Sequence, residues 1–131
     1  MFQVLLVEDN EISQKTLSQL LNFKDCGVTI AANGKQAVEA FSKRAYDLIL
    51  MDVQMPEMDG LDATRIIRGL ERGTGRRIPI VAITGYALEG DKERCLKAGM
   101  DGYLAKPVGM DDLFRVVEEF LEKAPEAALS Q

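Results

Sequence analysis

The sequence predicts an α/β protein, a three-layer α/β/α sandwich around a five-stranded parallel sheet. Two observations lead to this prediction. Five short apolar runs with strand character recur along the 131 residues, and the segments between them carry apolar residues at helical spacing. Parallel neighbours need long crossovers, and helical crossovers cover both faces of a sheet. The regular alternation therefore indicates one sheet between two layers of helices.

The five apolar runs are the predicted strands. In chain order they are Val4–Val7, Val28–Ile30, Leu48–Met51, Ile80–Ile83 and Tyr103–Ala105. The second run is short and has a threonine in its middle, which suits the edge of a sheet better than its centre. Pro79 stands just before the fourth run, where a strand can begin without a backbone donor.

The segments between the strands predict amphipathic helices laid on the sheet. The fourth helix, from about Glu89 to Ala98, has the weakest apolar stripe, so we expect it to be the most mobile. The apolar stripes are Leu17, Leu20 and Leu21; Ala37, Ala40 and Phe41; Ala63, Ile66, Ile67 and Leu70; Leu88, Cys95 and Leu96; and Leu113, Val116, Val117, Phe120 and Leu121.

Length and a hydrophobic content of 47% fit one domain. We predict that it spans residues 1–123 and that residues 124–131, which contain Pro125, form a flexible tail or the stub of a linker. The net charge of -5 disfavours direct nucleic-acid binding. A membrane span needs about 18 consecutive apolar residues, and no apolar stretch approaches that length. No leader precedes the first strand, so we expect a cytoplasmic protein without membrane insertion.

Histidine is absent, and the two cysteines are far apart in the sequence. The absence of histidine excludes Ser-His and Cys-His nucleophiles within these residues, together with the commonest ligand of transition metals. Cys26 and Cys95 form no metal-spaced pair, so we interpret them as reduced packing residues. Chemistry in this chain must therefore use carboxylates, hydroxyls and lysines.

Reactive side chains follow four of the five predicted strands. Glu8 and Asp9 follow the first strand, Asp52 the third, Thr84 the fourth and Lys106 the fifth. If these strands are parallel neighbours, the side chains meet at the end of the sheet where open α/β folds hold ligands. Asp52 ends a very apolar strand and needs a cation nearby, and Mg²⁺ prefers such hard oxygen ligands. The set suits phosphoryl transfer, in which an aspartate can form an aspartyl phosphate.

Each of these residues also has an ordinary structural explanation. Asp9 or Asn10 could cap the first helix, and Thr84 could be a plain strand-terminal hydroxyl. Their common placement at the strand ends favours a site. The arginines of residues 71–77 are better explained as a solvated loop than as a docking patch.

Four motifs stand at the predicted strand ends. They read Leu-Val-Glu-Asp-Asn at 6–10, Met-Asp-Val-Gln-Met-Pro-Glu-Met-Asp-Gly at 51–60, Ile-Thr-Gly at 83–85 and Tyr-Leu-Ala-Lys-Pro at 103–107. With them, the chain from Phe2 to Lys123 resembles the receiver domain of two-component response regulators, and the second motif is similar to receivers attached to hybrid sensor kinases. The resemblance implies the flavodoxin-like strand order 2-1-3-4-5 and a signalling switch rather than an enzyme.

The resemblance implies a role for each matching acid. Asp52 would be the phosphoacceptor. Asp9 and Asp52 would be carboxylate ligands of Mg²⁺, Glu8 would act through a bound water, and Gln54 would offer its backbone carbonyl. The phosphoryl group would come from a phosphohistidine on a histidine kinase or a histidine phosphotransfer protein.

Three further residues would operate the switch. Once Asp52 is phosphorylated, Thr84 would bond a phosphoryl oxygen, Lys106 would pair with the phosphoryl group, and Tyr103 would enter the vacated space. The surface of the fourth helix, fifth strand and fifth helix would then change shape toward a downstream output domain or target protein. The resemblance also implies a cis bond between Lys106 and Pro107.

Tyr86 and Gln54 stand at positions that influence hydrolysis of the aspartyl phosphate in this family. The size of both side chains predicts partial shielding from water and a long phosphorylated lifetime. Substituting Ala for Tyr86 should then speed dephosphorylation.

Two other functions share parts of this pattern. A Mg²⁺-dependent aspartyl-nucleophile phosphatase uses similar carboxylates, but such enzymes usually carry a second aspartate where Gln54 stands. A flavin-binding module shares the topology, but Glu8 and Asp9 would repel the flavin phosphate.

Overall fold

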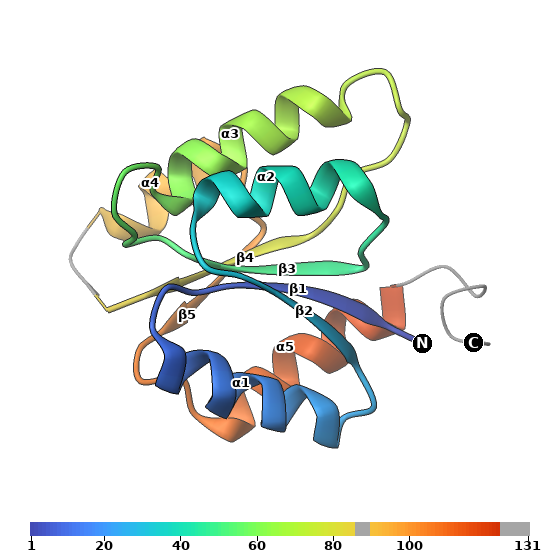
Figure 1. The fold of residues 1–131 in the computed structure, drawn as a ribbon, viewed down its shortest axis with the longest axis vertical. Coiled ribbons are helices and arrows are strands. Elements are labelled where there is room, and N and C mark those ends of the chain that lie inside the picture. Colours follow the sequence, from blue (N-terminus) through green and yellow to red (C-terminus); the bar gives the residue numbers. More distant parts are fainter. Residues whose placement is uncertain (86–89, 124–131) are drawn as a thin grey trace.

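The structure is a computed structural model that describes residues 1–85 and 90–123. The predicted fold is confirmed: five parallel strands form one sheet in the order 2-1-3-4-5. The second, third and fourth helices pack on one face and the first and fifth on the other, as Figure 1 shows. The elements are β1 (Gln3–Val7), α1 (Glu11–Phe23), β2 (Gly27–Ala31), α2 (Gly34–Lys43), β3 (Leu48–Asp52), α3 (Gly60–Glu71), β4 (Ile80–Thr84), α4 (Asp91–Ala98), β5 (Gly102–Ala105) and α5 (Met110–Lys123).

Each central strand serves two cores, because successive side chains point to opposite faces of the sheet. In β1, Leu5 and Val7 pack toward α2, α3 and α4, whereas Val4 and Leu6 pack toward α1 and α5. All residues of β3 and β4 are buried in the same alternating way. A polar side chain can therefore be placed only at the ends of these strands without interrupting a core.

β2 lies at the edge of the sheet beside β1, as predicted. Its outer residue Ile30 is 45% exposed. An edge strand is covered less completely than a central one, so a polar residue in its middle costs little.

Polar caps determine where two helices near the strand ends begin. The Asn10 side chain accepts a hydrogen bond from the Ser13 backbone N–H at 2.9 Å, and Asp59 accepts one from the Asp62 N–H at 2.9 Å. The cap of α1 is therefore Asn10. The carboxylate of Asp9 remains available for other contacts.

The buried face of α3 differs from its predicted apolar stripe. Ile67 is fully buried as expected, but Ile66 and Leu70 are 39% and 47% exposed. Thr64 takes an inward position instead, since its hydroxyl donates to the Gly60 carbonyl at 2.7 Å and needs no water. Relative to the predicted orientation, α3 is therefore rotated about its axis, so that Thr64 faces the core in place of Ile66 and Leu70.

α4 has the weak apolar face that its sequence predicts. Cys95 and Ala98 are buried, Leu96 is largely exposed, and Leu88 lies outside the described residues. Cys95 and Cys26 are both buried free thiols, which confirms their packing role. Burial raises the pKa of Cys26 to about 11, so this thiol stays protonated at neutral pH.

A dense ion-pair network holds the amino ends of β4 and β5. Arg68, on α3, donates to the Gly99 carbonyl at 2.9 Å and to the Ile78 carbonyl at 2.7 Å. It also pairs with Glu71 and Asp101, each at 2.7 Å. The guanidinium is thus surrounded by four acceptors. We call this set the Arg68 network.

Within the described ranges, no helix combines the length and apolar character that a membrane span requires. Tyr86 and the predicted tail at 124–131 lie outside these ranges.

Candidate functional site

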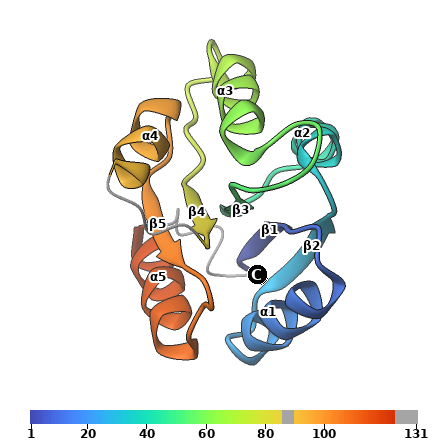
Figure 2. The same ribbon diagram turned by 90° about the vertical axis from the view of Figure 1, so that its left-hand side faces the viewer.

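The carboxyl ends of four strands bring the predicted side chains to one edge of the sheet, which Figure 2 faces. Glu8 and Asp9 follow β1 directly, and the register of β1 on β3 sets Glu8 beside Asp52. Asp52 ends β3, Thr84 ends β4, and Lys106 follows β5. The strand order 2-1-3-4-5 sets β1, β3, β4 and β5 side by side, which makes these ends neighbours.

Three carboxylates form a tight cluster at this edge. Glu8, Asp9 and Asp52 each offer one oxygen, and these oxygens all lie within 4.8 Å of one another. Glu8 and Asp52 are fully buried, whereas Asp9 is exposed. Negative charges this close repel one another, and two of them have also lost contact with water. The cluster requires positive charge.

Lys106 supplies one positive charge. Its Nζ donates to Asp52 Oδ2 at 2.9 Å and lies 3.5 Å from Glu8 Oε2. Burial alone would lower the pKa of Lys106, but its hydrogen bond and charge interactions with the two carboxylates outweigh burial and raise that pKa. The ammonium therefore stays charged. The bond from Lys106 to Pro107 is cis, as predicted.

The pKa of Glu8 indicates that the Lys106 ammonium alone does not compensate the negative charge of the three carboxylates. Burial, followed by the hydrogen bond and the charge of Asp52, raises the pKa of Glu8 to about 7. Lys106 and the Asn10 backbone N–H act in the opposite direction and do not cancel this rise. Glu8 Oε2 is buried without a hydrogen-bond partner, because 3.5 Å to Lys106 is an ion-pair contact rather than a good hydrogen bond.

The backbone around Asp52 is fixed by two further contacts. The Gln54 backbone N–H donates to Asp52 Oδ1 at 3.0 Å. Gly60 begins α3 directly against the end of β3, where an added Cβ would lie 2.3 Å from the Asp52 carbonyl oxygen. Only glycine permits this approach, so the start of α3 and the carboxylate are positioned together.

Thr84 and Tyr103 lie at a second carboxylate, Asp91. The Thr84 hydroxyl donates to Asp91 Oδ2 at 3.2 Å, and the Tyr103 hydroxyl lies 3.5 Å from the same oxygen, at the outer limit of a hydrogen bond. Sequence reasoning missed Asp91, because an acid in the first turn of a helix is ordinary there. The burial of Asp91 is a property of the tertiary structure and left no signal in the sequence.

A groove of about 400 Å³ opens beside the acid cluster. It lies between α1 and the connection from β5 to α5, and Ile12 at its rim is 78% exposed. Its lining residues are Glu8, Ile12, Ser13, Thr16, Leu17, Ile83, Lys106, Pro107 and Val108. The groove gives a partner molecule a surface next to Lys106.

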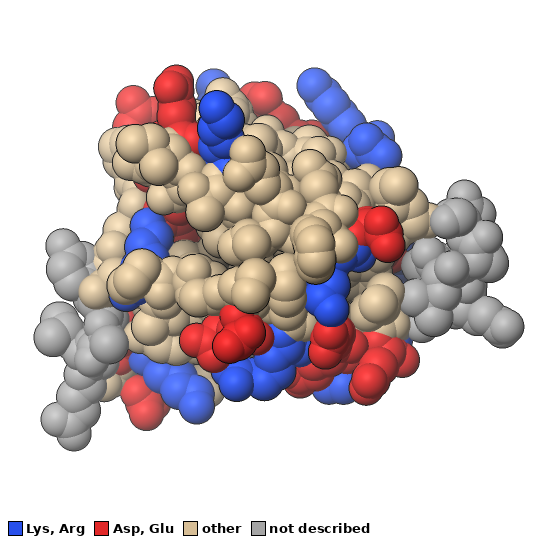
Figure 3. Space-filling view, turned by 90° about the horizontal axis from the view of Figure 1, so that it is seen from below, with Lys and Arg blue, Asp and Glu red and all other residues tan. Residues whose placement is uncertain are grey.

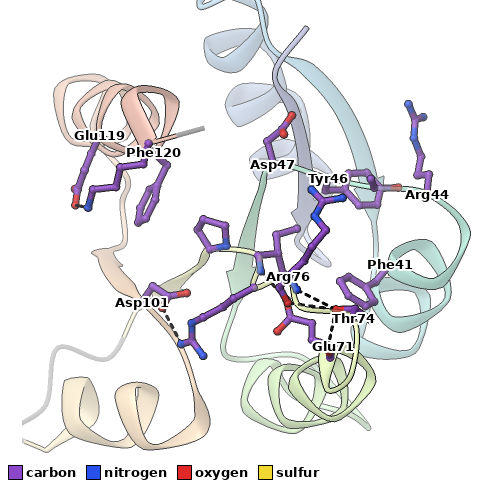
Figure 4. A pocket seen from close by; sticks show the side chains of 15 residues that line it. Phe41, Arg44, Tyr46, Asp47, Glu71, Thr74, Arg76, Asp101, Glu119 and Phe120 are labelled. Carbon is purple, nitrogen blue, oxygen red and sulfur yellow. Dashed lines mark hydrogen bonds and ion pairs between the residues drawn. The ribbon is translucent and has the colours of Figure 1, made fainter. Parts of the chain in front are cut away.

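A larger open cavity of about 710 Å³ lies at the opposite end of the sheet (Figure 4). Its acids already have partners there: Glu71 pairs with Arg68, and Asp101 pairs with both Arg68 and Arg77. None of the predicted site residues lines this cavity. Size alone therefore does not identify the functional site.

Comparison with known proteins gives a family match over most of the chain. The family model described as the response regulator receiver domain matches residues 4–118. Hybrid signal transduction histidine kinase I of Dictyostelium discoideum is 42% identical over 120 residues, which cover 88% of this chain and 7% of that protein. Across eight curated relatives, seven histidine kinases and the transcription factor SKN7 of Saccharomyces cerevisiae, the chain spans between 4% and 19% of their length.

Two solved structures extend the comparison. One is the receiver domain of a sensor histidine kinase from Pseudomonas aeruginosa PAO1, with magnesium in its active site cleft. It is 44% identical to this chain, has a TM-score of 0.83, and the match covers 92% of this chain and 98% of that one. A chain in the co-crystal structure of the Saccharomyces cerevisiae phosphotransfer protein Ypd1 and the receiver domain of Ssk1 is 34% identical, with a TM-score of 0.84 and coverage of 91% and 88%.

Proposed function

Because this chain belongs to the response regulator receiver domain family of phosphorelay signalling, we propose that it accepts a phosphoryl group from a partner phosphohistidine onto Asp52. One observation carries the proposal. Asp52 is fully buried at a strand end, 2.9 Å from the Lys106 ammonium and clustered with two more acids. A purely structural carboxylate would be paired without such neighbours.

The acid cluster fits a bound Mg²⁺. Its donors are hard oxygens, its formal charge exceeds what Lys106 supplies, and Glu8 Oε2 is buried without a hydrogen bond. We assign Asp9 and Asp52 as carboxylate ligands, Glu8 as a residue acting through water, and the Gln54 carbonyl as a further ligand. The magnesium in the receiver structure from Pseudomonas aeruginosa supports this assignment. When bound, the ion would neutralise negative charge on the phosphoryl oxygens.

The transfer step uses Asp52 as the nucleophile. One carboxylate oxygen forms the bond to phosphorus while the bond from phosphorus to the donor imidazole nitrogen breaks, and the electron pair leaves with that nitrogen. Lys106 is close enough to pair with a phosphoryl oxygen on Asp52. No histidine occurs in these 131 residues, so the donor belongs to a histidine kinase or histidine phosphotransfer protein. The domain receives the group and does not turn over a substrate.

The output of the switch would be a change in the surface of α4, β5 and α5. Thr84, at the end of β4, would bond the phosphoryl oxygen, and Tyr103, on β5, would move with it. The added phosphoryl charge would stabilise the minor one of two arrangements. A downstream output domain or target protein would bind the changed surface.

The phosphodonor would approach over α1. Figure 3 faces α1 and α5 and shows a broad central area with neither acidic nor basic side chains. Glu11 and Lys15 are the charged residues of α1. Ile12 is an exposed apolar residue at the rim of the groove beside Lys106, which suits an apolar protein contact close to Asp52. The phosphotransfer complex among the matching structures supports a donor of this class.

This docking proposal has its own test. Ile12→Glu should slow phosphoryl transfer from phosphorylated Ypd1, used as the probe, and leave the rate with acetyl phosphate unchanged. Gln19→Glu places the same charge elsewhere on α1 and serves as the control. Equal rates of phosphoryl transfer from phosphorylated Ypd1 to the two variants would contradict docking at Ile12.

We extend the proposal to the organisation of the chain. Residues 1–123 would form the receiver domain, and residues 124–131 would be a tail or a linker to another domain. Similarity to hybrid kinases supports a linker. A donor phosphorylated from ATP would place the reaction in the cytoplasm.

Mass spectrometry after incubation with Mg²⁺ and acetyl phosphate tests the central proposal. We expect one added phosphoryl group on Asp52, stable to acid and labile to base. Asp52→Asn should lose the label, and Asp111→Asn, which changes an exposed acid of α5, should keep it. Labelling of Asp52→Asn to the wild-type extent at another residue would overturn the assignment.

A further inference from the structure

Asp91 occupies a position where one carboxylate contacts three elements. It is the first residue of α4 and is only 3% exposed. Its Oδ2 accepts the Thr84 hydroxyl from β4 at 3.2 Å and lies 3.5 Å from the Tyr103 hydroxyl on β5. Its Oδ1 accepts from the Arg94 guanidinium at 2.6 Å. The two residues assigned to the switch thus meet at a single oxygen of α4.

The strength of these contacts follows from burial and charge. Hydrogen bonds to an ionised, buried acceptor are stronger than those between neutral groups. Burial, followed by the negative charge of Asp91, raises the pKa of Tyr103, so its hydroxyl keeps the proton that it can donate. α4 has little else to hold it, since Cys95 and Ala98 are its other buried residues. The position of α4 therefore depends on Asp91 more than on a hydrophobic face.

A hydroxyl carries one proton, and this creates a competition. While Thr84 donates to Asp91 Oδ2, it cannot donate to a phosphoryl oxygen on Asp52. Phosphorylation that recruits Thr84 must first break the Thr84–Asp91 bond. That change leaves Asp91 with Tyr103 and Arg94 among the partners described here, and it alters the side chains that anchor the start of α4.

We infer that Asp91 is a positioning residue that holds Thr84 and Tyr103 in the unphosphorylated arrangement and so couples phosphorylation of Asp52 to movement of α4. This inference rests on the proposed function. The Thr84 hydroxyl is exchanged between two acceptors, Asp91 in one state and the phosphoryl group in the other. Asp91 opposes activation until the phosphoryl group outcompetes it.

The inference predicts the direction of a mutational effect. Asp91→Ala removes the competing acceptor, so the arrangement adopted after phosphorylation becomes easier to reach. We expect the rate of phosphorylation by acetyl phosphate to rise about tenfold, the lower end of the range expected when a charge-assisted bond is lost from the starting state only, because the Thr84–Asp91 contact is long at 3.2 Å. Asp91→Asn keeps the shape with a weaker, neutral acceptor, so it should show a smaller rise.

NMR spectroscopy of the full chain provides a readout that a purely structural role would not change. In unphosphorylated Asp91→Ala, the resonances of Thr84 and Tyr103 should shift along the line that joins the unphosphorylated and phosphorylated wild-type positions. Glu93→Gln removes one negative charge from an exposed side chain in the same first turn of α4. This variant is the matched control, with resonances and rate expected at wild-type values. Loosening of α4 alone would broaden resonances without moving them along that line.

The outcomes separate the inference from the proposed function. If wild-type protein takes up the phosphoryl group on Asp52 but Asp91→Ala matches Glu93→Gln in rate and resonances, the role of Asp91 is wrong and the phosphoacceptor stands. If wild-type Asp52 takes up no phosphoryl group, the proposed function itself fails. Should Asp91→Ala not fold, Asp91→Asn decides by the same two measurements.

Discussion

The two ends of the sheet both gather charged side chains, but they do so differently. At the amino end, the Arg68 network gives one guanidinium four acceptors, including Glu71 and Asp101. The Asp101 carboxylate also accepts from the Ile80 backbone N–H and from Arg77. At the carboxyl end, Lys106 contacts Asp52 and Glu8 within a cluster of three acids, and one buried carboxylate oxygen lacks a hydrogen bond.

The difference separates charges that hold the fold from charges that are available for chemistry. A saturated network has nothing further to bind, so it contributes rigidity between α3, β4 and β5. An under-compensated cluster is unfavourable alone and becomes favourable with an added cation. The larger open cavity lies beside the saturated network, whereas the small groove lies beside the under-compensated acids.

The largest effect is expected from breaking the saturated end. Arg68→Met keeps part of the side-chain stem but removes the guanidinium from Glu71 and leaves Asp101 with Arg77 as its ion-pair partner. The Arg68 side chain is only 12% exposed. The free energy of unfolding should fall by about 3–5 kcal/mol in urea denaturation. Arg65→Met, on the same helix with a side chain 58% exposed, should stay within about 0.5 kcal/mol of wild type. Similar stabilities for the two variants would show that the network is not structural.

The second effect concerns the reactive end. Lys106→Met should slow phosphorylation of Asp52 by acetyl phosphate about a hundredfold, because it removes a cation directed at the phosphoryl oxygens. It should cost less stability than Arg68→Met, since Glu8 can take up a proton. Lys92→Met, which changes an exposed lysine, is the control. A wild-type rate of phosphorylation for Lys106→Met would show that Lys106 does not assist the transfer to Asp52.

The third effect is a pH dependence of the metal-free protein. The pKa of Glu8 rises from an ordinary 4.5 to about 7 on folding. Between these values the folded state keeps a proton that the unfolded state has released, so the free energy of unfolding falls as pH rises through this window. Glu8→Gln removes that fall and should be more stable than wild type at pH 8 by about 3 kcal/mol.

The comparison for this experiment is made at two pH values. At about pH 4, wild type and Glu8→Gln should have nearly equal stabilities, because both then carry a neutral side chain. Glu39→Gln, which changes an exposed acid of α2, should follow wild type at both. A difference between wild type and Glu8→Gln that does not depend on pH would point to packing instead of charge.

The smallest effect is the response to Mg²⁺. At about ten times its dissociation constant, the ion should raise the free energy of unfolding by about 1.4 kcal/mol in wild type. Asp9→Asn should lose most of this gain, while Arg68→Met should keep it, because the Arg68 network is already saturated. Equal responses in both variants would place the ion elsewhere.

Much of the fold followed from local patterns. The five strands, the edge position of β2 and the weak apolar face of α4 match the predictions, since burial on one or two faces imposes a period on apolar residues. The rotation of α3 did not follow. Ile66 and Leu70 fit the helical stripe, but Thr64 satisfied its hydroxyl on the backbone and took an inward place.

The acids and the lysine of the site were predictable because each follows a strand directly, and parallel strands end together. The roles given to these residues remain predictions for the experiments above. The contacts of Asp91 were not predictable, because Asp91 lies on α4 whereas its partners Thr84 and Tyr103 lie on β4 and β5.

By itself, the sequence determined the alternation of strands and helices and the chemical type of side chain that follows each strand, because both are local properties of the chain. The tertiary structure alone decided which charges are saturated and which are not. Compensation of a buried charge depends on distance and desolvation, and both are set by residues far away in sequence, such as Asp52 with Lys106 and Arg68 with Asp101.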